Sequence, residues 1–436
     1  MNDRLSGLPA DMSAPARPKW TAAVALLAML AATAILAQFF RTSTAILGPE
    51  LIRDLDLSPE AFGLANASFF IALLLAQIPV GLAYDRFGPR LTVAALFVPM
   101  AAGAMLHGLA DTGAQMAVAR FVTGIGCAAG FTASVVLVSA WFSRPSWSMT
   151  LSWLIALSHL GAVLAGTPLA AATQLIGWRF TFVAMGLVAV LIGYLFVLVV
   201  RDRPPGAPRT PTEGGPGALS GLWQVMRMPG MGRLLVMFMV AYAVLVTVQV
   251  LWSGPYLHDV HGLDTLERGH VLLGMAVAQT VGTLLVGPMD RVLNTRKWVV
   301  VAAASLTLAS LTVLAVVPVS LPVAVGLLLV LSGSSTYGSV LYAQVRGLFP
   351  DHLAGRSATI TNMAPLLGAS VLPTLTGFIP PLFPSRGEGY SLLAYQSIFA
   401  TLAICLAVGL AIYMTARDVK PRPSELTPGR ASPSAG

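Results

Sequence analysis

The sequence predicts an all-α integral membrane protein whose twelve transmembrane helices form two six-helix bundles. Three observations carry this prediction: an apolar composition, a series of apolar runs of membrane-spanning length, and a linker that divides the runs six and six. Of the 436 residues, 56% are hydrophobic and only 10% are charged. An average soluble domain has about 25% charged residues, so the composition excludes a soluble globular protein. It also excludes a disordered chain, because disorder requires low hydrophobicity.

The apolar runs are long enough to cross a bilayer as helices, since one crossing takes roughly 20 residues. They are continuous rather than alternating, which argues against a transmembrane β-barrel. The first run is too long for the core of a signal peptide and is expected to remain as a span. The expected spans are 20–47, 59–83, 91–110, 113–141, 147–172, 178–200, 231–257, 268–288, 297–317, 320–346, 357–380 and 390–415. At the second span, Ser58, Pro59 and Glu60 give a helix cap, a proline at the first helical position and an acid in the first turn.

A linker separates the two sets of six spans. Residues 201–217 contain five Pro and four Gly, a composition typical of a loop. The expected organisation is an N-terminal tail at 1–19, a first bundle at 20–200, a central linker at 201–230, a second bundle at 231–415 and a C-terminal tail at 416–436.

Basic residues predict the orientation of the chain. Twenty of the 26 Lys and Arg residues fall in the two tails, the central linker and the loops that lie on the same side of the expected spans. By the positive-inside rule, both termini are expected in the cytoplasm of a protein of the inner (plasma) membrane. The net charge of +8 is then explained by loops that face anionic lipid headgroups, and no nucleic acid partner is required.

The sequence predicts neither an enzyme nor a cofactor site. Cys127 and Cys405 are the only cysteines, and both lie in apolar runs, so neither a disulfide nor a metal site is expected. No phosphate-binding glycine loop is present, which excludes ATP as the energy source. The spans show no nucleophile and base at a suggestive spacing. A monomer is expected.

Two short charged segments occupy the same place in the two halves. Gly81-Leu-Ala-Tyr-Asp85-Arg86-Phe-Gly88-Pro-Arg90 follows the second span, and Gly287-Pro-Met-Asp290-Arg291-Val-Leu-Asn-Thr-Arg296-Lys297 follows the eighth. This weak internal repeat indicates two homologous six-helix halves, which is typical of one class of secondary transporter.

The first segment closely resembles the loop signature of the major facilitator superfamily, a Gly-x-x-x-Asp-Arg-x-Gly pattern between the second and third helices. Arg120-Phe-Val-Thr-Gly124-Ile-Gly126 resembles the signature of that superfamily in the fourth helix. The resemblance implies the major facilitator fold and transport by alternating access. It also implies a gate that holds the halves together on the cytoplasmic side in one state, made of Asp85, Arg86, Gly88 and Arg90 with a second copy at Asp290 and Arg291. The second copy departs from the pattern, and either copy could be a charged turn that only sets topology.

The fifth helix bears on the kind of transporter. It reads Gly161-Ala-Val-Leu-Ala-Gly166-Thr-Pro168 and lacks the Gly-Pro-rich signature of drug/proton antiporters, which argues against a drug exporter without excluding one.

Inside the expected spans, no Asp or Glu lies near the middle. A carrier of this kind couples to protons without a buried carboxylate, or does not couple to protons. The ionisable residues within the spans are Arg41, Arg120 and His159, each of which requires a partner or a role in the membrane. For Arg120 the resemblance implies a buried hydrogen-bonding or proton-relay role, with helix packing as the alternative. His159 is either a coupling site for a proton, since histidine titrates near neutral pH, or a neutral hydrogen-bonding residue.

Arg41 is the main candidate for substrate binding. Residues 38–51 resemble the first helix of the organophosphate and organic-anion branch of the superfamily, in which an arginine at this place faces the central cavity and binds the anion. Gln38 is three residues away and shares its helix face. Part of that branch has a second arginine in the seventh helix, but 246–257 has no basic residue, which argues against phosphate and leaves a carboxylate or a larger weak anion. Alternatively, Arg41 extends outward to the membrane surface.

Further polar residues could line a cavity near the midplane or satisfy a neighbouring helix. The candidates for substrate contact are Gln249, Trp252, Tyr337 and Asn362. The expected function is secondary active transport of a small organic anion across the inner membrane, with a coupling proton or ion left open. The alternatives are a proton-driven exporter of drugs or metabolites and a non-transporting membrane sensor.

Overall fold

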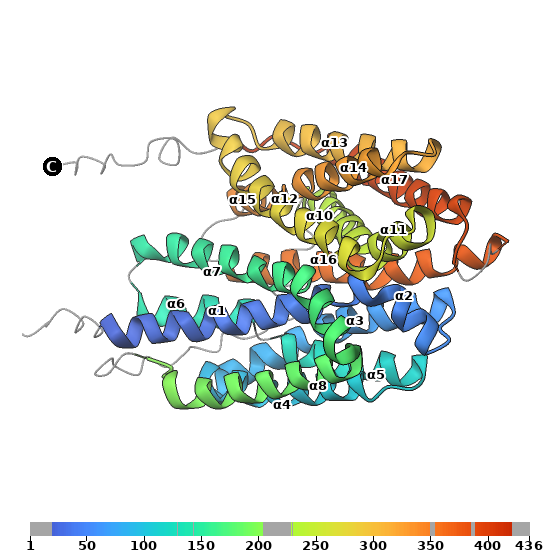
Figure 1. Cartoon of the computed structure of the whole chain (residues 1–436). Helices are drawn as coiled ribbons and strands as arrows, with labels where there is room; N and C mark the ends of the chain where they lie inside the picture. Colours follow the sequence, from blue (N-terminus) through green and yellow to red (C-terminus); the bar gives the residue numbers. More distant parts are fainter. Residues whose placement is uncertain are drawn as a thin grey trace, which may run out of the picture.

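The structure is a computed structural model that describes residues 20–128, 130–142, 144–203, 228, 230–348, 354–384 and 389–420. The expected N-terminal tail, most of the linker and most of the C-terminal tail lie outside these residues. The described chain is built from helices (Figure 1): α1 (Trp20–Thr42), α2 (Thr44–Asp54), α3 (Pro59–Phe87), α4 (Pro89–Gly108), α5 (Gly113–Cys127), α6 (Gly130–Trp141), α7 (Arg144–Leu164), α8 (Thr167–Val199), α10 (Met231–Val246), a π-helix (Thr247–Trp252), α11 (Ser253–His261), α12 (Thr265–Val292), α13 (Lys297–Val316), α14 (Leu321–Ser334), α15 (Gly338–Leu348), α16 (Ala354–Gly377), a 3-10 turn (Pro380–Leu382) and α17 (Leu392–Met414).

The described residues contain 11 helical stretches that are long and apolar enough to cross a membrane. One of them, Trp153–Val199, is 47 residues long. It contains Gly177, whose φ of 77° and ψ of 157° interrupt the helix. This stretch therefore covers both the fifth and the sixth expected spans, and the predicted all-α membrane fold is confirmed with a span count close to twelve.

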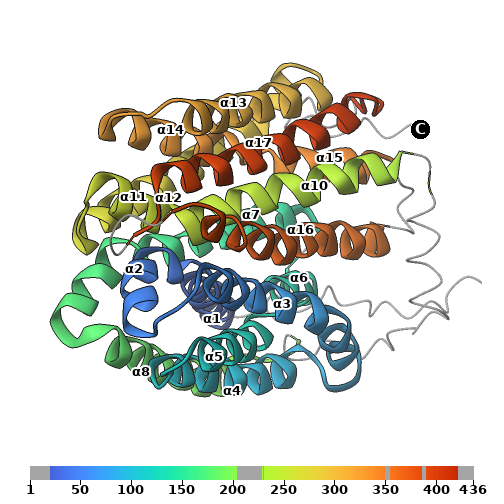
Figure 2. The same ribbon diagram turned by 90° about the vertical axis from the view of Figure 1, so that its right-hand side faces the viewer.

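The helices form two groups that follow the order of the chain. In Figures 1 and 2, α1 to α8 lie together on one side of the molecule and α10 to α17 on the other. The first group is held by packing of α4 against α8 and α5, and the second by packing of α10 against α16 and α13 against α17. The groups meet where α3 packs on α16, α2 on α11, and α12 on α7 and α8.

The two groups approach each other closely at the end of the molecule away from the start of α10 and the end of α17. Arg233 Nη1 donates to the Thr415 carbonyl (3.0 Å), so the start of α10 and the end of α17 share one end of the molecule. At the opposite end the backbones of the two groups nearly touch: a Cβ at Gly254 of α11 would collide with the Ala45 carbonyl of α2, and a Cβ at Gly63 of α3 would lie 2.8 Å from the Pro373 carbonyl of α16. Glycine permits this close approach, which closes that end.

The first and fourth spans of each half are interrupted helices. The first breaks at Ser43, where the hydroxyls of Thr42 and Ser43 bond to the Gln38 carbonyl (2.9 Å) and the Phe40 carbonyl (3.3 Å). The corresponding span of the second half changes to the π-helix, a form often found at functional sites. The fourth and tenth spans break between α5 and α6 and between α14 and α15. In many secondary transporters the binding site is formed by discontinuous helices.

Capping hydrogen bonds hold the first turns of α3 and α12 in place. Ser58 caps α3 by accepting from the Ala61 amide (3.2 Å), as the sequence predicts. At α12, Asp264 accepts from the Glu267 amide (2.8 Å), and Glu267 accepts from the Asp264 amide (3.0 Å). This reciprocal pair is a capping box, which satisfies two exposed donors of the first turn and holds the helix start in place.

We expect fusions after residues 210 and 425 to place the reporter in the cytoplasm, because the basic loops hold both segments on that side. At these two positions the fluorescent protein should fluoresce and the phosphatase should be inactive. The measurement is a paired phosphatase and fluorescent-protein assay on each fusion. A fusion after residue 262, in the loop between α11 and α12, is the control for the opposite side. A periplasmic signal from either of the first two fusions would overturn the predicted topology.

Candidate functional site

Arg41 spans the interface between the two bundles. It lies in the last turn of α1, beside the break at Ser43, and is half-buried. Its Nη1 donates to the Tyr242 hydroxyl of α10 (3.1 Å) and to Gln38 Oε1 (3.4 Å). Its Nε is buried and has no hydrogen-bond partner among the described residues. The guanidinium thus contacts the second bundle and retains a free donor there, a geometry different from extension outward to the membrane surface.

A small cavity lies between the bundles at Thr42, the residue that follows Arg41 in the chain. Its lining comes from both halves: Thr42, Ala45, Ala162, Ala165, Gln249, Leu272 and Ala276. Gln249 belongs to the π-helix and is held by a bond from its Nε2 to Gln279 Oε1 (3.3 Å). The two interrupted first spans therefore meet at this cavity and supply its polar groups.

The other predicted contacts of substrate lie in the second bundle. Trp252 is fully buried, and its indole Nε1 donates to the Thr376 hydroxyl (2.9 Å). Tyr337 lies in the break between α14 and α15 and is buried, with no hydrogen-bond partner for its hydroxyl among the described residues. Asn362 is half-buried and accepts from the Tyr342 hydroxyl (3.5 Å). Among the described hydrogen bonds, none joins these three residues to Arg41, so their part in binding stays a prediction.

Arg120 forms a hydrogen bond to the last turn of α1, which also contains Arg41. Its side chain is 1% exposed. Nη1 donates to the Phe40 carbonyl of α1 (2.6 Å), Nη2 donates to Asn66 Oδ1 of α3 (3.4 Å), and the guanidinium lies over the Phe69 ring (4.6 Å). Arg120 is therefore a hydrogen-bonding tie between α5, α1 and α3. A proton-relay role for it is untested.

His159 lies near Arg41 on the adjoining helix. The two side chains interact electrostatically, and α7 packs on α1 so closely that a Cβ at Gly161 would lie 2.9 Å from Gln38 Cβ. The Nδ1 of His159 is buried and has no hydrogen-bond partner among the described residues. A coupling role for His159 stays a prediction.

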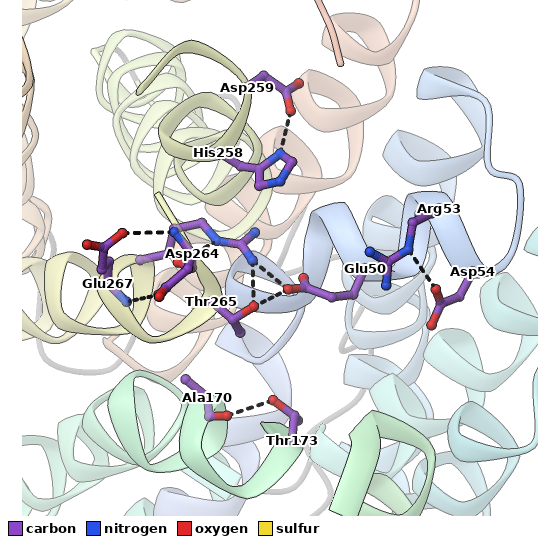
Figure 3. Close-up of polar contacts among 11 residues, drawn as sticks. Glu50, Arg53, Asp54, Ala170, Thr173, His258, Asp259, Asp264, Thr265 and Glu267 are labelled. Carbon is purple, nitrogen blue, oxygen red and sulfur yellow. Dashed lines mark hydrogen bonds and ion pairs between the residues drawn. The ribbon is translucent and has the colours of Figure 1, made fainter. Parts of the chain in front are cut away.

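A second cluster joins the bundles at their closed end (Figure 3). Glu50 of α2 accepts from Arg268 Nη2 of α12 (2.5 Å) and from the Thr265 hydroxyl. Arg268 is 1% exposed and also donates from Nε to the Asp264 carbonyl (3.1 Å). We call Glu50, Thr265 and Arg268 the outer clamp. This cluster was not predicted from the sequence, in which its available signal is a pair of opposite charges beside two loops that the predicted topology places on one side.

The two charged turns at the other end form matching structures. In the first half, Asp202 accepts from the Arg90 amide (2.7 Å), and the Arg90 guanidinium donates to the Val197 carbonyl (2.6 Å). Gly88 turns the chain with a φ of 80°, and a side chain there would collide with Asp202. The carboxylate at this helix start is therefore Asp202, which follows the sixth span.

In the second half, Asp418 takes the same position after the last span. It accepts from the amides of Arg296 (3.1 Å) and Lys297 (3.0 Å), and Lys297 Nζ donates to the Met414 carbonyl (2.5 Å). This repetition supports two homologous halves. Neither acid was predicted from the sequence, where the only signal for each is its place just after the sixth span of its half.

The remaining predicted gating residues differ in environment. The side chain of Asp85 lies outside the described residues. Arg86 and Arg291 are exposed, with Arg86 over the Phe87 ring (5.3 Å). Asp290 is buried and pairs with Arg296 (3.2 Å). The contacts of Arg90 with Asp202 and Val197, of Asp290 with Arg296, and of Asp418 with Arg296 and Lys297 each lie within one bundle.

The bundle interface places the Arg41 guanidinium among neutral polar side chains. Among the described residues, no three His, Cys, Asp or Glu side chains gather as metal ligands. What the bundle interface offers is a guanidinium, which matches the planar shape of a carboxylate, beside neutral hydrogen-bonding side chains. Such charge-assisted bonds are stronger than neutral ones.

Comparison with known proteins adds an independent result. A family model described as Major Facilitator Superfamily matches residues 29–373. A protein of Escherichia coli (strain K12) named "probable galactarate/D-glucarate transporter" is 23% identical, over 85% of this chain and 89% of its own length. A protein of Mycolicibacterium smegmatis named "MFS-type efflux pump" is 30% identical, over 85% of this chain and 86% of its own. A solved structure of a bacterial homologue of the human lysosomal transporter Spinster, inward-facing and unoccupied, has a TM-score of 0.75 at 17% identity and covers 91% of this chain and 97% of its own.

Proposed function

The chain belongs to the major facilitator superfamily, and we propose that it is a secondary active transporter that moves a small organic anion across the inner membrane by alternating access. The observation that carries the proposal is the guanidinium of Arg41, which reaches the bundle interface with neutral partners and a buried free Nε. A buried charge without a counter-ion is costly, and an anionic ligand would supply one.

The substrate class that fits best is a hydroxylated carboxylate. Arg41 takes a carboxylate through two parallel N–H donors, while Gln38, Tyr242 and Gln249 are neutral groups suited to hydroxyls. Relatives named as transporters of galactarate, D-glucarate and tartrate support this class.

Alternating access requires the bundle interface to open and close at each of its two ends in turn. The outer clamp and the close glycine contacts hold one end shut, and at the other end the hydrogen bonds that Asp202 and Asp418 accept each stay within one bundle. We assign the shut end to the periplasm and both chain termini to the cytoplasm. The structure then corresponds to a carrier open toward the cytoplasm.

Export is the second candidate, because the relative named as an efflux pump is 30% identical to this chain. A cationic drug would need a carboxylate in the cavity, and the expected spans have none near their middle. The anion proposal therefore applies to either direction of transport.

A ligand-stability screen of the purified protein tests the proposal. Ligands that bind the folded state raise its melting temperature as their concentration rises. We expect galactarate, D-glucarate or tartrate to raise it, and the neutral polyol galactitol and the cation tetraethylammonium to leave it unchanged. Stabilisation by the cation and by none of the acids would contradict an anion carrier.

A further inference from the structure

The charges around the cavity bear on how transport is driven. The six expected spans of each bundle have Asp or Glu only at their ends. The acid nearest to Arg41 along the chain is Glu50, which is already bound to Arg268 and Thr265 in the outer clamp. The bundle interface at Arg41 therefore has a fixed positive charge, and the expected spans have no carboxylate near their middle that could take up or release a proton to balance it.

Every described partner of the two arginines is neutral. Arg41 donates to an amide oxygen and a phenol hydroxyl. Arg120 donates to a backbone carbonyl and an amide oxygen and lies over an aromatic ring. Both arginines have a buried Nε without a hydrogen-bond partner among the described residues. The empty site thus lacks the counter-charge that a bound anion provides.

The lack of a counter-charge in the empty site affects the step in which the empty carrier returns to the other side of the membrane. Alternating access requires the cavity to close on both sides before it opens to the other, and closure removes water from Arg41. A desolvated charge without a counter-ion is strongly unfavourable, whereas a charge paired with a carboxylate is tolerated. The loaded carrier should therefore pass through the closed state more easily than the empty one.

We propose that this protein is an anion exchanger: it changes sides with an anion bound in both directions, and its empty form changes sides at least tenfold more slowly. The inference rests on the proposed function and specifies its driving force. One organic anion moves inward because another moves outward, and no proton gradient is required.

The titratable groups near Arg41 and Arg120 are consistent with anion exchange that needs no proton gradient. His159 and Cys127 interact electrostatically with Arg41, Cys127 and His107 interact with Arg120, and the Tyr242 hydroxyl accepts from Arg41. Protonation of either histidine would add positive charge to a site that already lacks a counter-charge. A proton taken up there would therefore compensate nothing.

The test uses the full chain in proteoliposomes loaded with galactarate or with galactitol, its neutral counterpart, and clamped at zero membrane potential. We expect initial uptake of labelled galactarate to be at least tenfold faster into the galactarate-loaded vesicles. An inside-alkaline pH gradient should not raise uptake into the galactitol-loaded vesicles. Equal rates in both, or a pH gradient that raises galactitol-loaded uptake to the exchange rate, would overturn the proposal.

Gln38→Glu is the discriminating variant, because it is nearly isosteric and places a carboxylate where Gln38 Oε1 accepts from Arg41. The new carboxylate supplies the missing counter-charge, so the empty carrier can return. We expect the ratio of exchange to net uptake to fall at least fivefold and net uptake to become dependent on the pH gradient. Gln38→Ala, which removes the contact without adding charge, should keep the high ratio, and an unchanged ratio in folded Gln38→Glu would count against the proposal.

Two further results separate the possible failures. His159→Ala should leave the exchange rate independent of a pH gradient, and loss of gradient-driven uptake in that variant would instead identify His159 as a coupling site. If galactarate stabilises the protein and crosses the membrane without a preference for loaded vesicles, exchange fails while anion transport stands. If no organic acid stabilises the protein or crosses, both proposals fail.

Discussion

Arg41→Gln is expected to weaken binding of the organic anion about ten- to a hundredfold. The variant removes the charge that pairs with the carboxylate, and one charge-assisted hydrogen bond of this kind contributes roughly 1.5–3 kcal/mol. Arg41→Lys should give an intermediate loss, because lysine retains the charge but not the planar pair of donors. The measurement is a titration of each purified variant with galactarate, by calorimetry or by melting temperature.

Arg53→Gln is the matched control for this experiment. Arg53 lies on α2, its side chain is 70% exposed, and it pairs with the neighbouring Asp54 (3.1 Å). Its loss should leave anion binding unchanged. Binding as tight in Arg41→Gln as in the wild type would show that Arg41 has no part in recognition, and the anion proposal would lose its main support.

Breaking the outer clamp is expected to reduce transport at least tenfold. Arg268 is almost fully buried against Glu50, so Glu50→Gln leaves a buried charge unpaired. Removal of one partner of a buried pair costs about 3–5 kcal/mol, and here that cost is borne only by the conformation closed at the outer end. The variant should therefore favour the conformation open to the periplasm and cycle slowly.

The readouts are transport and access to the cavity from outside. A cysteine placed at Ala45, which lines the cavity, reports access to a membrane-impermeant thiol reagent once Cys127 and Cys405 are replaced by Ser. Labelling from outside should rise in Glu50→Gln and in Arg268→Gln. The reversed pair, Glu50→Arg with Arg268→Glu, should lower it again and restore part of the transport, whereas full transport by either single variant would show that the clamp does not control closure.

The parts of the structure that depend on local patterns were predictable from sequence. Apolar runs of span length gave nearly all the helices, and Ser58 with Pro59 marked the start of α3 correctly. Arg41 stood out because a charge within a membrane span is costly wherever it lies. The structure adds that this residue and Gln249 both lie at or beside interruptions of the first span of their half.

The parts that depend on pairing between distant residues were not predictable. The Glu50–Arg268 contact joins residues 218 positions apart, and it requires two separate helix ends to meet across the bundle interface. Tyr242 is one of nine tyrosines, and its only signal was a spacing of two helical turns from Gln249. The π-helix Thr247–Trp252 has no distinct signature in the residues that form it. The roles of Asp202 and Asp418 likewise become visible only when the helix starts they cap lie beside them.

Counterflow of labelled galactarate tests the central claim, that this chain carries organic anions through a site built on Arg41, most directly. Proteoliposomes that contain unlabelled galactarate are exposed to labelled galactarate or to labelled tetraethylammonium, with the wild type and Arg41→Gln measured in parallel. The account predicts that the wild type transiently concentrates labelled galactarate but not the labelled cation, and that Arg41→Gln concentrates neither compound. Transport of the cation, or galactarate counterflow undiminished in Arg41→Gln, would contradict it.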